Sequence, residues 1–271
     1  MLEFPEAYTF AQQIRENLVG KIISYIEVLQ TPHRFAFFKG DVDSYDDMLE
    51  GQKIVGATNH GGTIQIDLED SMIAFADGAY PRYFEDSKKF PKKHQFAIHF
   101  DDDTALFVSI QMYGEVFVFP KGECTDGYYI SSSSKPNPLS DEFTFAYFQS
   151  LFQSVNKRMS AKAFLATEQR VPGLGNGVLQ NILWDAGIDP RCYITEADLE
   201  PLYHSMRKIL KQMVEAGGRD TEKTLFSEKG SYITQLSKNS LHQPCMKCGN
   251  EIHKANYMGG TVYFCEHCQR R

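Results

Sequence analysis

The sequence predicts a multidomain α+β protein, and three observations carry this prediction. Strand-length runs of β-branched and aromatic residues fill the first half after an opening helix. Apolar residues recur with a helical period in the second half. Two CxxC pairs lie near the C-terminus. We therefore expect an N-terminal domain over residues 1–127, a linker over 128–140, a helical domain over 141–240 and a metal-binding finger over 241–271.

The chain opens on MLEFPE, which predicts the start of a helix. Pro5 fixes φ near −65° and lacks an N–H. Acids such as Glu6 suit the positive end of the helix dipole. Phe10 and Ile14 mark the apolar face of the expected helix.

Four segments after this helix have the length and composition of β-strands, with partial alternation of apolar and polar residues. Turn residues separate them, and no helical pattern stands between them. This arrangement favours antiparallel sheets packed as a β-sandwich. The segments are KIISYIEVLQ (21–30), GGTIQIDLED (61–70), QFAIHFDD (95–102) and ALFVSIQM (105–112).

The pattern becomes helical after a Ser- and Pro-rich stretch, YYISSSSKPNPLSDE, which we interpret as a linker rather than an ordinary surface loop. The third expected helix ends at Gly187, and Gly217-Gly218 closes the fourth. Ser160 is the candidate N-cap of the second. The four expected helices cover residues 141–155, 160–169, 176–187 and 196–215.

Charge is unevenly distributed along the 271 residues, whose formal net charge is −7. Residues 151–271 hold 16 Lys+Arg against 12 Asp+Glu, a balance of +4, whereas residues 1–150 hold 12 against 23, a balance of −11. Such asymmetry is compatible with a nucleic-acid-binding face on the C-terminal half. The N-terminus is acidic without an apolar signal region, and no apolar run approaches about 18 residues. These features predict a cytoplasmic protein that does not enter membranes.

Four of the six cysteines follow a metal-ligand pattern: Cys245-x-x-Cys248, sixteen residues, then Cys265-x-x-Cys268. Two CxxC turns at this spacing are typical of one tetrahedral Zn²⁺ held by four thiolates. The residues from 254 to 264 fit a hairpin between the pairs, with a turn at Gly259-Gly260. Disulfides are disfavoured in a cytoplasmic chain, and a redox site needs only one CxxC. Four thiolates leave no open position for a catalytic water, so the zinc is expected to be structural.

The stretch VPGLGN (171–176) places a glycine-rich turn before a helix. The backbone N–H groups of such a turn, Gly175 among them, can bind a phosphate at the positive end of the helix dipole. Asn176 is placed to cap the helix and to donate its side-chain amide to a phosphate oxygen. On these residues alone, a purely structural tight turn is an equal alternative.

Together these motifs resemble the formamidopyrimidine-DNA glycosylase / endonuclease VIII family over nearly the whole chain. The resemblance rests on Glu3, Pro5 and Glu6, on VPGLGN followed by a helix that ends in Ala-Gly-Ile-x-Pro (186–190), on Gly217-Gly218, and on the four-cysteine finger with Gln269 behind it. It implies a β-sandwich domain, a helix–two-turn–helix domain and a zinc finger.

The resemblance also implies a function, namely base-excision DNA repair by a bifunctional glycosylase. Such an enzyme flips a damaged base out of double-stranded DNA, removes it, and cuts the strand by β- or β,δ-elimination. The nucleophile would be the α-amine of Leu2 after loss of Met1, since an α-amine has a pKa near 8 and is partly neutral at pH 7. Glu3 would move protons and Glu6 would support the site. We further expect a monomer that is nucleoid-associated when it binds DNA.

Several positions depart from the family pattern. Leu2 stands where the family has proline, and methionine is generally retained before a side chain of this size. A retained Met1 would move the free amine by about 3.3–3.6 Å. Gly62 replaces an expected lysine, and Gly260 replaces an expected phosphate-binding arginine.

The family's Arg-Phe-Gly, which fills the gap left by a flipped base, corresponds here to Met112-Tyr113-Gly114. An apolar side chain such as Met112 can still wedge between bases. These departures leave an alternative, a catalytically silent protein of the same fold that binds damaged or abasic DNA. A zinc-stabilised protein-interaction module would explain the finger but neither VPGLGN nor the acidic N-terminus.

Overall fold

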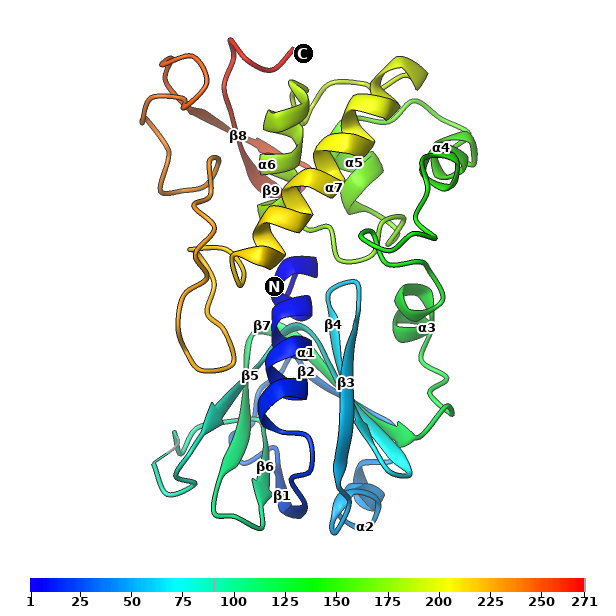
Figure 1. Ribbon diagram of the computed structural model, residues 1–271, viewed down its shortest axis with the longest axis vertical. Coiled ribbons are helices and arrows are strands. Elements are labelled where there is room, and N and C mark those ends of the chain that lie inside the picture. Colours follow the sequence, from blue (N-terminus) through cyan, green and yellow to red (C-terminus); the bar gives the residue numbers. More distant parts are fainter. Residues whose placement is uncertain (90, 271) are drawn as a thin grey trace.

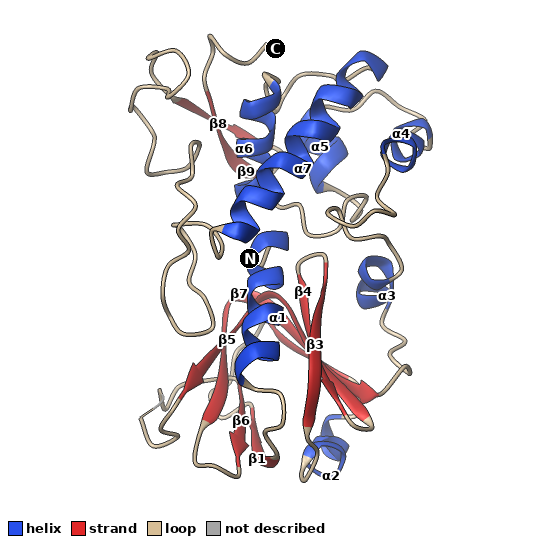
Figure 2. Cartoon of the chain, in the orientation of Figure 1, coloured by secondary structure: helices blue, strands red, loops and turns tan. Residues whose placement is uncertain are grey.

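The computed structural model describes residues 1–89 and 91–270 and shows a β-rich lobe and a helical lobe, with the N-terminal helix running from the junction into the β lobe (Figure 1). Strands fill the lower lobe and helices most of the upper one, where a small hairpin adds the remaining strands (Figure 2). The predicted α+β class is confirmed.

Helix α1 (Phe4–Asn17) begins where the sequence predicts, with Pro5 in its first turn. Its apolar face contacts β3 and β4 of the sheet, and its N-terminal end reaches α7. Phe10 and Ile14 are fully buried in the core of the β lobe, whereas Phe4 belongs to the core of the helical lobe. One helix therefore contributes to both cores.

Seven strands form a single sheet in the described part of the chain, and all neighbours pair antiparallel except β2 with β7. The order is β1-β6-β7-β5-β4-β3. The strands are β1 (Ile23–Val28), β2 (Ala36–Lys39), β3 (Ile54–His60), β4 (Thr63–Leu68), β5 (Ser71–Phe84), β6 (Phe96–Phe100) and β7 (Ala105–Pro120).

The two longest strands, β5 and β7, give this sheet its two halves. Residues 79–84 of β5 pair with 105–110 of β7 beside β6, whereas residues 71–77 pair with 114–120 beside β4. The register shifts between Asp77 and Ala79. Such an irregularity bends a strand pair and increases its twist, so each long strand serves both halves.

The segment predicted as a linker contains a short helix that its sequence pattern does not predict. Helix α3 (Gly127–Ser133) starts at Asp126, whose carboxylate accepts hydrogen bonds from the N–H groups of Tyr128 and Tyr129. Both tyrosines pack on the outer face of the sheet around Phe117. The serine-rich composition gives no helical period, so the helix depends on its cap and on this packing.

Helices α4 (Phe145–Gln153), α5 (Ala161–Ala166), α6 (Asn176–Ala186) and α7 (Leu199–Glu215) build the helical lobe around a core that includes Phe148, Phe164 and Leu179. Ser160 caps α5 as predicted, and Gly187 ends α6 with φ +71°. Short helical segments complete the fold: η1 (Val42–Ser44), α2 (Tyr45–Leu49) and η2 (Glu196–Asp198).

The finger contains the expected hairpin, made of β8 (His253–Tyr257) and β9 (Gly260–Phe264). The turn lies at Met258-Gly259, both with positive φ, so Gly260 begins β9 instead of completing the turn. Gln269 joins the finger to the end of α6, because it accepts from the Cys265 N–H and donates to the Ile188 carbonyl, both at 2.9 Å.

None of the helices in residues 1–89 and 91–270 combines the length and the apolarity that crossing a membrane requires.

Candidate functional site

The first residues of the chain lie between the two lobes. Leu2 is buried in the β-lobe core, and its N–H donates to the carbonyl of Asp77 at the sheet irregularity. Phe4 donates its N–H to the carbonyl of Gly173 at 2.8 Å, in the loop before α6. The backbone of residues 2–4 is therefore fixed to both lobes.

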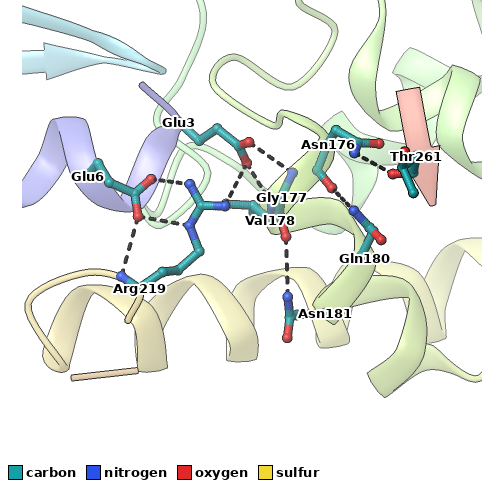
Figure 3. A network of polar contacts seen from close by, with 9 residues as sticks. All are labelled: Glu3, Glu6, Asn176, Gly177, Val178, Gln180, Asn181, Arg219 and Thr261. Atoms are coloured by element: carbon teal, nitrogen blue, oxygen red, sulfur yellow. Dashed lines mark hydrogen bonds and ion pairs between the residues drawn. The ribbon is translucent and has the colours of Figure 1, made fainter. Parts of the chain in front are cut away.

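Glu3 occupies the N-terminal end of α6. Its carboxylate accepts the N–H of Gly177 at 2.9 Å and that of Val178 at 2.6 Å (Figure 3). An anion at this end of a helix satisfies orphan N–H groups and is favoured by the helix dipole. The anion seat predicted from VPGLGN is thus partly filled by a side chain of the protein itself.

Asn176 does not cap α6, which corrects the prediction. The N-cap is Gly175, without a side-chain hydrogen bond, and Asn176 is the first helical residue. The Asn176 side-chain amide donates to the carbonyl of Thr261 in the finger at 2.8 Å (Figure 3). Its buried side-chain oxygen has no hydrogen-bond partner among the described residues. The residue therefore links α6 to the hairpin, a contact between segments 85 residues apart.

Arg219 joins the two N-terminal acids and was not predicted. Its guanidinium binds the Glu6 carboxylate in a bidentate pair of 2.9 and 2.7 Å, and its third nitrogen lies 3.6 Å from Glu3 (Figure 3). Burial disfavours the charged guanidinium, but the carboxylates of Glu3 and Glu6 outweigh this effect and raise the pKa of Arg219. The sequence offers only the Gly-Gly that closes α7 as a signal, and it does not distinguish the arginine behind it.

The glycines of the turn leave room for this cluster. A Cβ on Gly175 would lie 2.5 Å from the Glu3 carboxyl carbon, and one on Gly177 would overlap the Arg219 guanidinium. Side chains at these positions are therefore incompatible with the observed acids and arginine. Gly175 and Gly177 of VPGLGNG therefore allow Glu3 and Arg219 to lie against the N-terminal end of α6.

Met1 borders two cavities. The larger, about 320 Å³, is also lined by Glu3, Asn176, Arg219 and Glu222. The smaller, about 100 Å³, lies on the other side and is lined by Asp77 and Gly173 among others. Burial raises the pKa of Asp77. The hydrogen bond from Tyr128 and the charge of the N-terminus partly offset this increase. The two cavities therefore meet at the N-terminal residues Met1 and Glu3, which border both.

Met112 and Tyr113 lie at the irregularity of β7, where three residues of β7 stand opposite Gly78. Met112 has φ +63° and its side chain is 78% exposed. The Tyr113 hydroxyl donates to the sulfur of Met1 at 2.6 Å. The predicted wedge residue thus projects into solvent, while its neighbour contacts the chain terminus.

Lys162 is a further candidate that was not predicted. Its ammonium donates to the Tyr257 carbonyl at 2.7 Å, and burial lowers its pKa. A Cβ on Gly260 would lie 3.3 Å from this ammonium and 3.7 Å from the Asn176 side chain. Lys162, Asn176 and Gly260 therefore meet where α5, α6 and the finger come together, although no local sequence pattern indicates it.

The four predicted ligands, Cys245, Cys248, Cys265 and Cys268, form one cluster. Their sulfur atoms all lie within 4.8 Å of one another. Two of the sulfur pairs are 3.8 and 3.5 Å apart, close to the separation of about 3.8 Å that a tetrahedral site with Zn–S bonds of about 2.3 Å requires. The six cysteines are not joined by disulfides. This cluster can hold a metal ion.

Comparison with known proteins agrees with this geometry. Residues 1–149 match the family model described as the formamidopyrimidine-DNA glycosylase N-terminal domain. The chain is 27% identical to a formamidopyrimidine-DNA glycosylase of Streptococcus pneumoniae, over the full length of both, and 29% identical to one of Legionella pneumophila, over 99% and 98%. The fold matches that of Lactococcus lactis Fpg in a complex with abasic-site DNA, with TM-score 0.84, 21% identity and coverage of 99% and 100%.

Proposed function

The chain belongs to the formamidopyrimidine-DNA glycosylase family, and from this premise we propose that it is a base-excision repair enzyme, a DNA glycosylase with abasic-site lyase activity. The observation that carries the proposal is the position of the N-terminus, which lies between two cavities beside the buried cluster of Glu3, Glu6 and Arg219. The substrate is damaged double-stranded DNA, and the protein acts as a cytoplasmic monomer.

The N-terminal amine is the proposed nucleophile, and it belongs to Leu2 once Met1 is removed. Neutral amine attacks C1′ of the damaged nucleotide, and the base leaves with the electrons of the glycosidic bond. The amine then loses a proton, the C1′–O4′ bond breaks with its electrons on O4′, which takes up a proton, and an imine to the sugar forms. The hydrogen bond from the Leu2 nitrogen to the Asp77 carbonyl supports this assignment, because it gives an amine at position 2 a defined place. Loss of the Met1 side chain, which borders both cavities, would also add space there for the sugar.

Glu3 is proposed to transfer protons during ring opening and elimination, and Glu6 to hold the site in shape. The Glu3 carboxylate borders both cavities, so it is adjacent to the proposed position of the sugar. Glu6 acts through Arg219, whose bidentate contact fixes the guanidinium against Glu3. The two acids therefore have different tasks, and Glu6 is a positioning residue.

The DNA backbone is proposed to bind along the turn before α6. Glu3 takes the N–H groups of Gly177 and Val178, which leaves those of Gly175 and Asn176 for a phosphate. Lys162 lies close enough to this corner to add a positive charge. Met112, with Tyr113 beside it, is proposed to fill the gap left by the flipped base.

We propose that the metal of the finger is one structural Zn²⁺ held by the four cysteines. The sulfur separations fit a tetrahedral site, and four thiolates leave no open position for a reactant. The metal stabilises the finger, and the protein side chains carry the chemistry.

A second candidate, a silent DNA-binding protein of this fold, is favoured by one observation. A Cβ on Gly62 would lie 2.8 Å from the Leu2 carbonyl, so the observed backbone leaves no space for the lysine expected there. The two candidates differ in one measurable property, the formation of an imine.

Borohydride trapping tests the proposal on a duplex that contains an abasic site. A covalent adduct is expected, and peptide mapping should find it on the N-terminal residue. Intact mass shows in the same sample whether Met1 is present. Binding of the duplex without any adduct would leave the silent binder as the correct description, whereas an adduct on a lysine would contradict the terminal nucleophile.

A further inference from the structure

Glu222 is an acid of the large cavity to which the family resemblance assigns no role. It follows Arg219 by three residues in the loop after α7. Its side chain lines the same cavity as Met1, Glu3 and Asn176. Leu2 lines the smaller cavity, and Met1 borders both, so loss of Met1 would open the cavity of Glu222 toward the Leu2 amine.

The carboxylate of Glu222 is free to accept a proton, unlike the carboxylates of Glu3 and Glu6, which are engaged in hydrogen bonds. Both oxygens of Glu3 accept backbone N–H groups, and both oxygens of Glu6 accept from Arg219. In the described part of the chain, no hydrogen bond or close ion pair engages the Glu222 carboxylate, and the residue is half-buried. A group that must accept and release a proton needs such freedom.

The surroundings of Glu222 favour its protonated form. Burial raises its pKa, the charges of Arg219 and of the Met1 ammonium act against this, and the carboxylates of Glu6 and Glu3 raise it further. Tyr80 and Arg82 of β5 also interact electrostatically with Glu222. A carboxyl group with a raised pKa is a better proton acceptor at neutral pH than an ordinary one.

We propose that Glu222 accepts the proton of the N-terminal ammonium and so produces the neutral amine that attacks C1′. An N–H bond of the ammonium breaks, its electron pair stays on nitrogen, and an O–H bond forms on the Glu222 carboxylate. This inference rests on the proposed lyase function and adds a residue to it. Glu3 remains the proposed proton donor and acceptor at the sugar.

The test is the rate of borohydride trapping on an abasic-site duplex as a function of pH, for the wild type and Glu222→Gln. An amine with a pKa near 8 is only about one-tenth neutral at pH 7 when no base assists it, so the variant should be up to about 10-fold slower at pH 7. At about pH 9.5 an amine with a pKa near 8 is neutral without help, so the two rates should approach each other. Glu228→Gln is the matched control, because Glu228 is exposed in the same loop, and it should follow the wild type.

Affinity for a duplex with a tetrahydrofuran abasic-site analogue, measured on the same proteins, separates chemistry from structure. Unchanged affinity together with the pH-dependent loss supports the proposal. Equal trapping rates at every pH, a loss that is the same at every pH, or a parallel loss of affinity and melting temperature would each overturn it. Absence of any wild-type adduct at any pH, with binding intact, would instead overturn the lyase function itself and this inference with it.

Discussion

At the scale of single residues, the centre of the molecule is a buried arginine between two buried glutamates. Arg219, Glu3 and Glu6 each have side chains exposed by 8% or less. Removing one member of such a cluster leaves an uncompensated charge in a place that water does not reach. The same three residues connect the chain terminus, helix α6 and the loop after α7. Their loss should therefore affect stability as well as catalysis.

Arg219→Met should lower the free energy of unfolding by about 3–5 kcal/mol, the usual cost of breaking a buried ion pair. Chemical denaturation at pH 7 measures it. Arg158→Met is the control, because Arg158 is exposed and stacks on Tyr193, and its effect should stay within about 0.5 kcal/mol. Equal effects of the two substitutions would contradict the structural role of Arg219.

Glu222→Gln should stabilise the protein at neutral pH. The folded state raises the pKa of Glu222 above the unfolded value of about 4.3. The folded state therefore binds more protons between these two pKa values, and its stability falls as pH rises through this window. The amide removes this cost. Unfolding curves should show the variant more stable at pH 7 and equal to the wild type below about pH 4, with Glu228→Gln unchanged throughout. A less stable variant at pH 7 would show that the carboxylate supports the fold.

At the scale of secondary structure elements, the finger is attached to α6 through particular contacts. The indole N–H of Trp184, the only tryptophan of the chain, donates to the sulfur of Cys245 at 3.3 Å. Lys247 donates to the Trp184 carbonyl and stacks on its ring. Asn176, at the start of α6, donates a hydrogen bond to Thr261 of β9, and Gln269 donates one to Ile188 just after α6. The order of the finger is therefore reported by one fluorophore on a neighbouring helix.

Cys265→Ser should abolish binding of the proposed zinc and disorder the finger, because the proposed site uses all four thiolates and metal binding is coupled to folding. Trp184 emission should shift to longer wavelength as its ring becomes exposed, and affinity for abasic-site DNA should fall with it. Far-ultraviolet circular dichroism should change little, since the helical core lies outside the finger. Cys124→Ser is the control, because Cys124 lies in the β lobe. Metal content and emission equal to the wild type would contradict the four-cysteine site.

At the scale of the whole molecule, the N-terminal segment joins two separate cores. Leu2 packs in one core and Phe4 in the other, so a short segment couples the lobes to the proposed reaction. Charge adds a second asymmetry, since the helical and finger half is the positive one. DNA binding is therefore expected to depend on the basic residues near α6 and on salt.

Lys162→Met should weaken binding of abasic-site and undamaged duplexes by a similar factor, because a phosphate contact carries no sequence or lesion information. The plot of the logarithm of the association constant against the logarithm of the salt concentration should become less steep by about 1. Lys53→Met is the control, because Lys53 precedes β3 at the end of the sheet beside α2, away from the helical lobe (Figure 1). An unchanged slope would remove Lys162 from the proposed backbone contact.

Much of the fold follows from local patterns, and the exceptions have physical reasons. The four strand segments and the caps at Ser160 and Gly187 lie where their residues predict them. Strand β5 carries no clear alternation because its central residues are buried on both faces, so its pattern does not identify it as a strand. Helix α3 was missed because a cap and distant packing partners stabilise it rather than a helical period.

The sequence by itself determined the family, the class of most long elements and the four-cysteine cluster, because period and spacing are local properties that short segments carry. Only the tertiary structure decided what the opening acids do. Glu3 reaches Val178 across 175 residues and Glu6 reaches Arg219 across 213. No local pattern records a contact at such separation, so MLEFPE predicts a helix start but neither the helix that Glu3 caps nor the arginine that Glu6 binds. A similarly long stretch of sequence separates Glu222 from the amine that it is proposed to activate, and only the cavity that Glu222 shares with Met1 and Glu3 relates them.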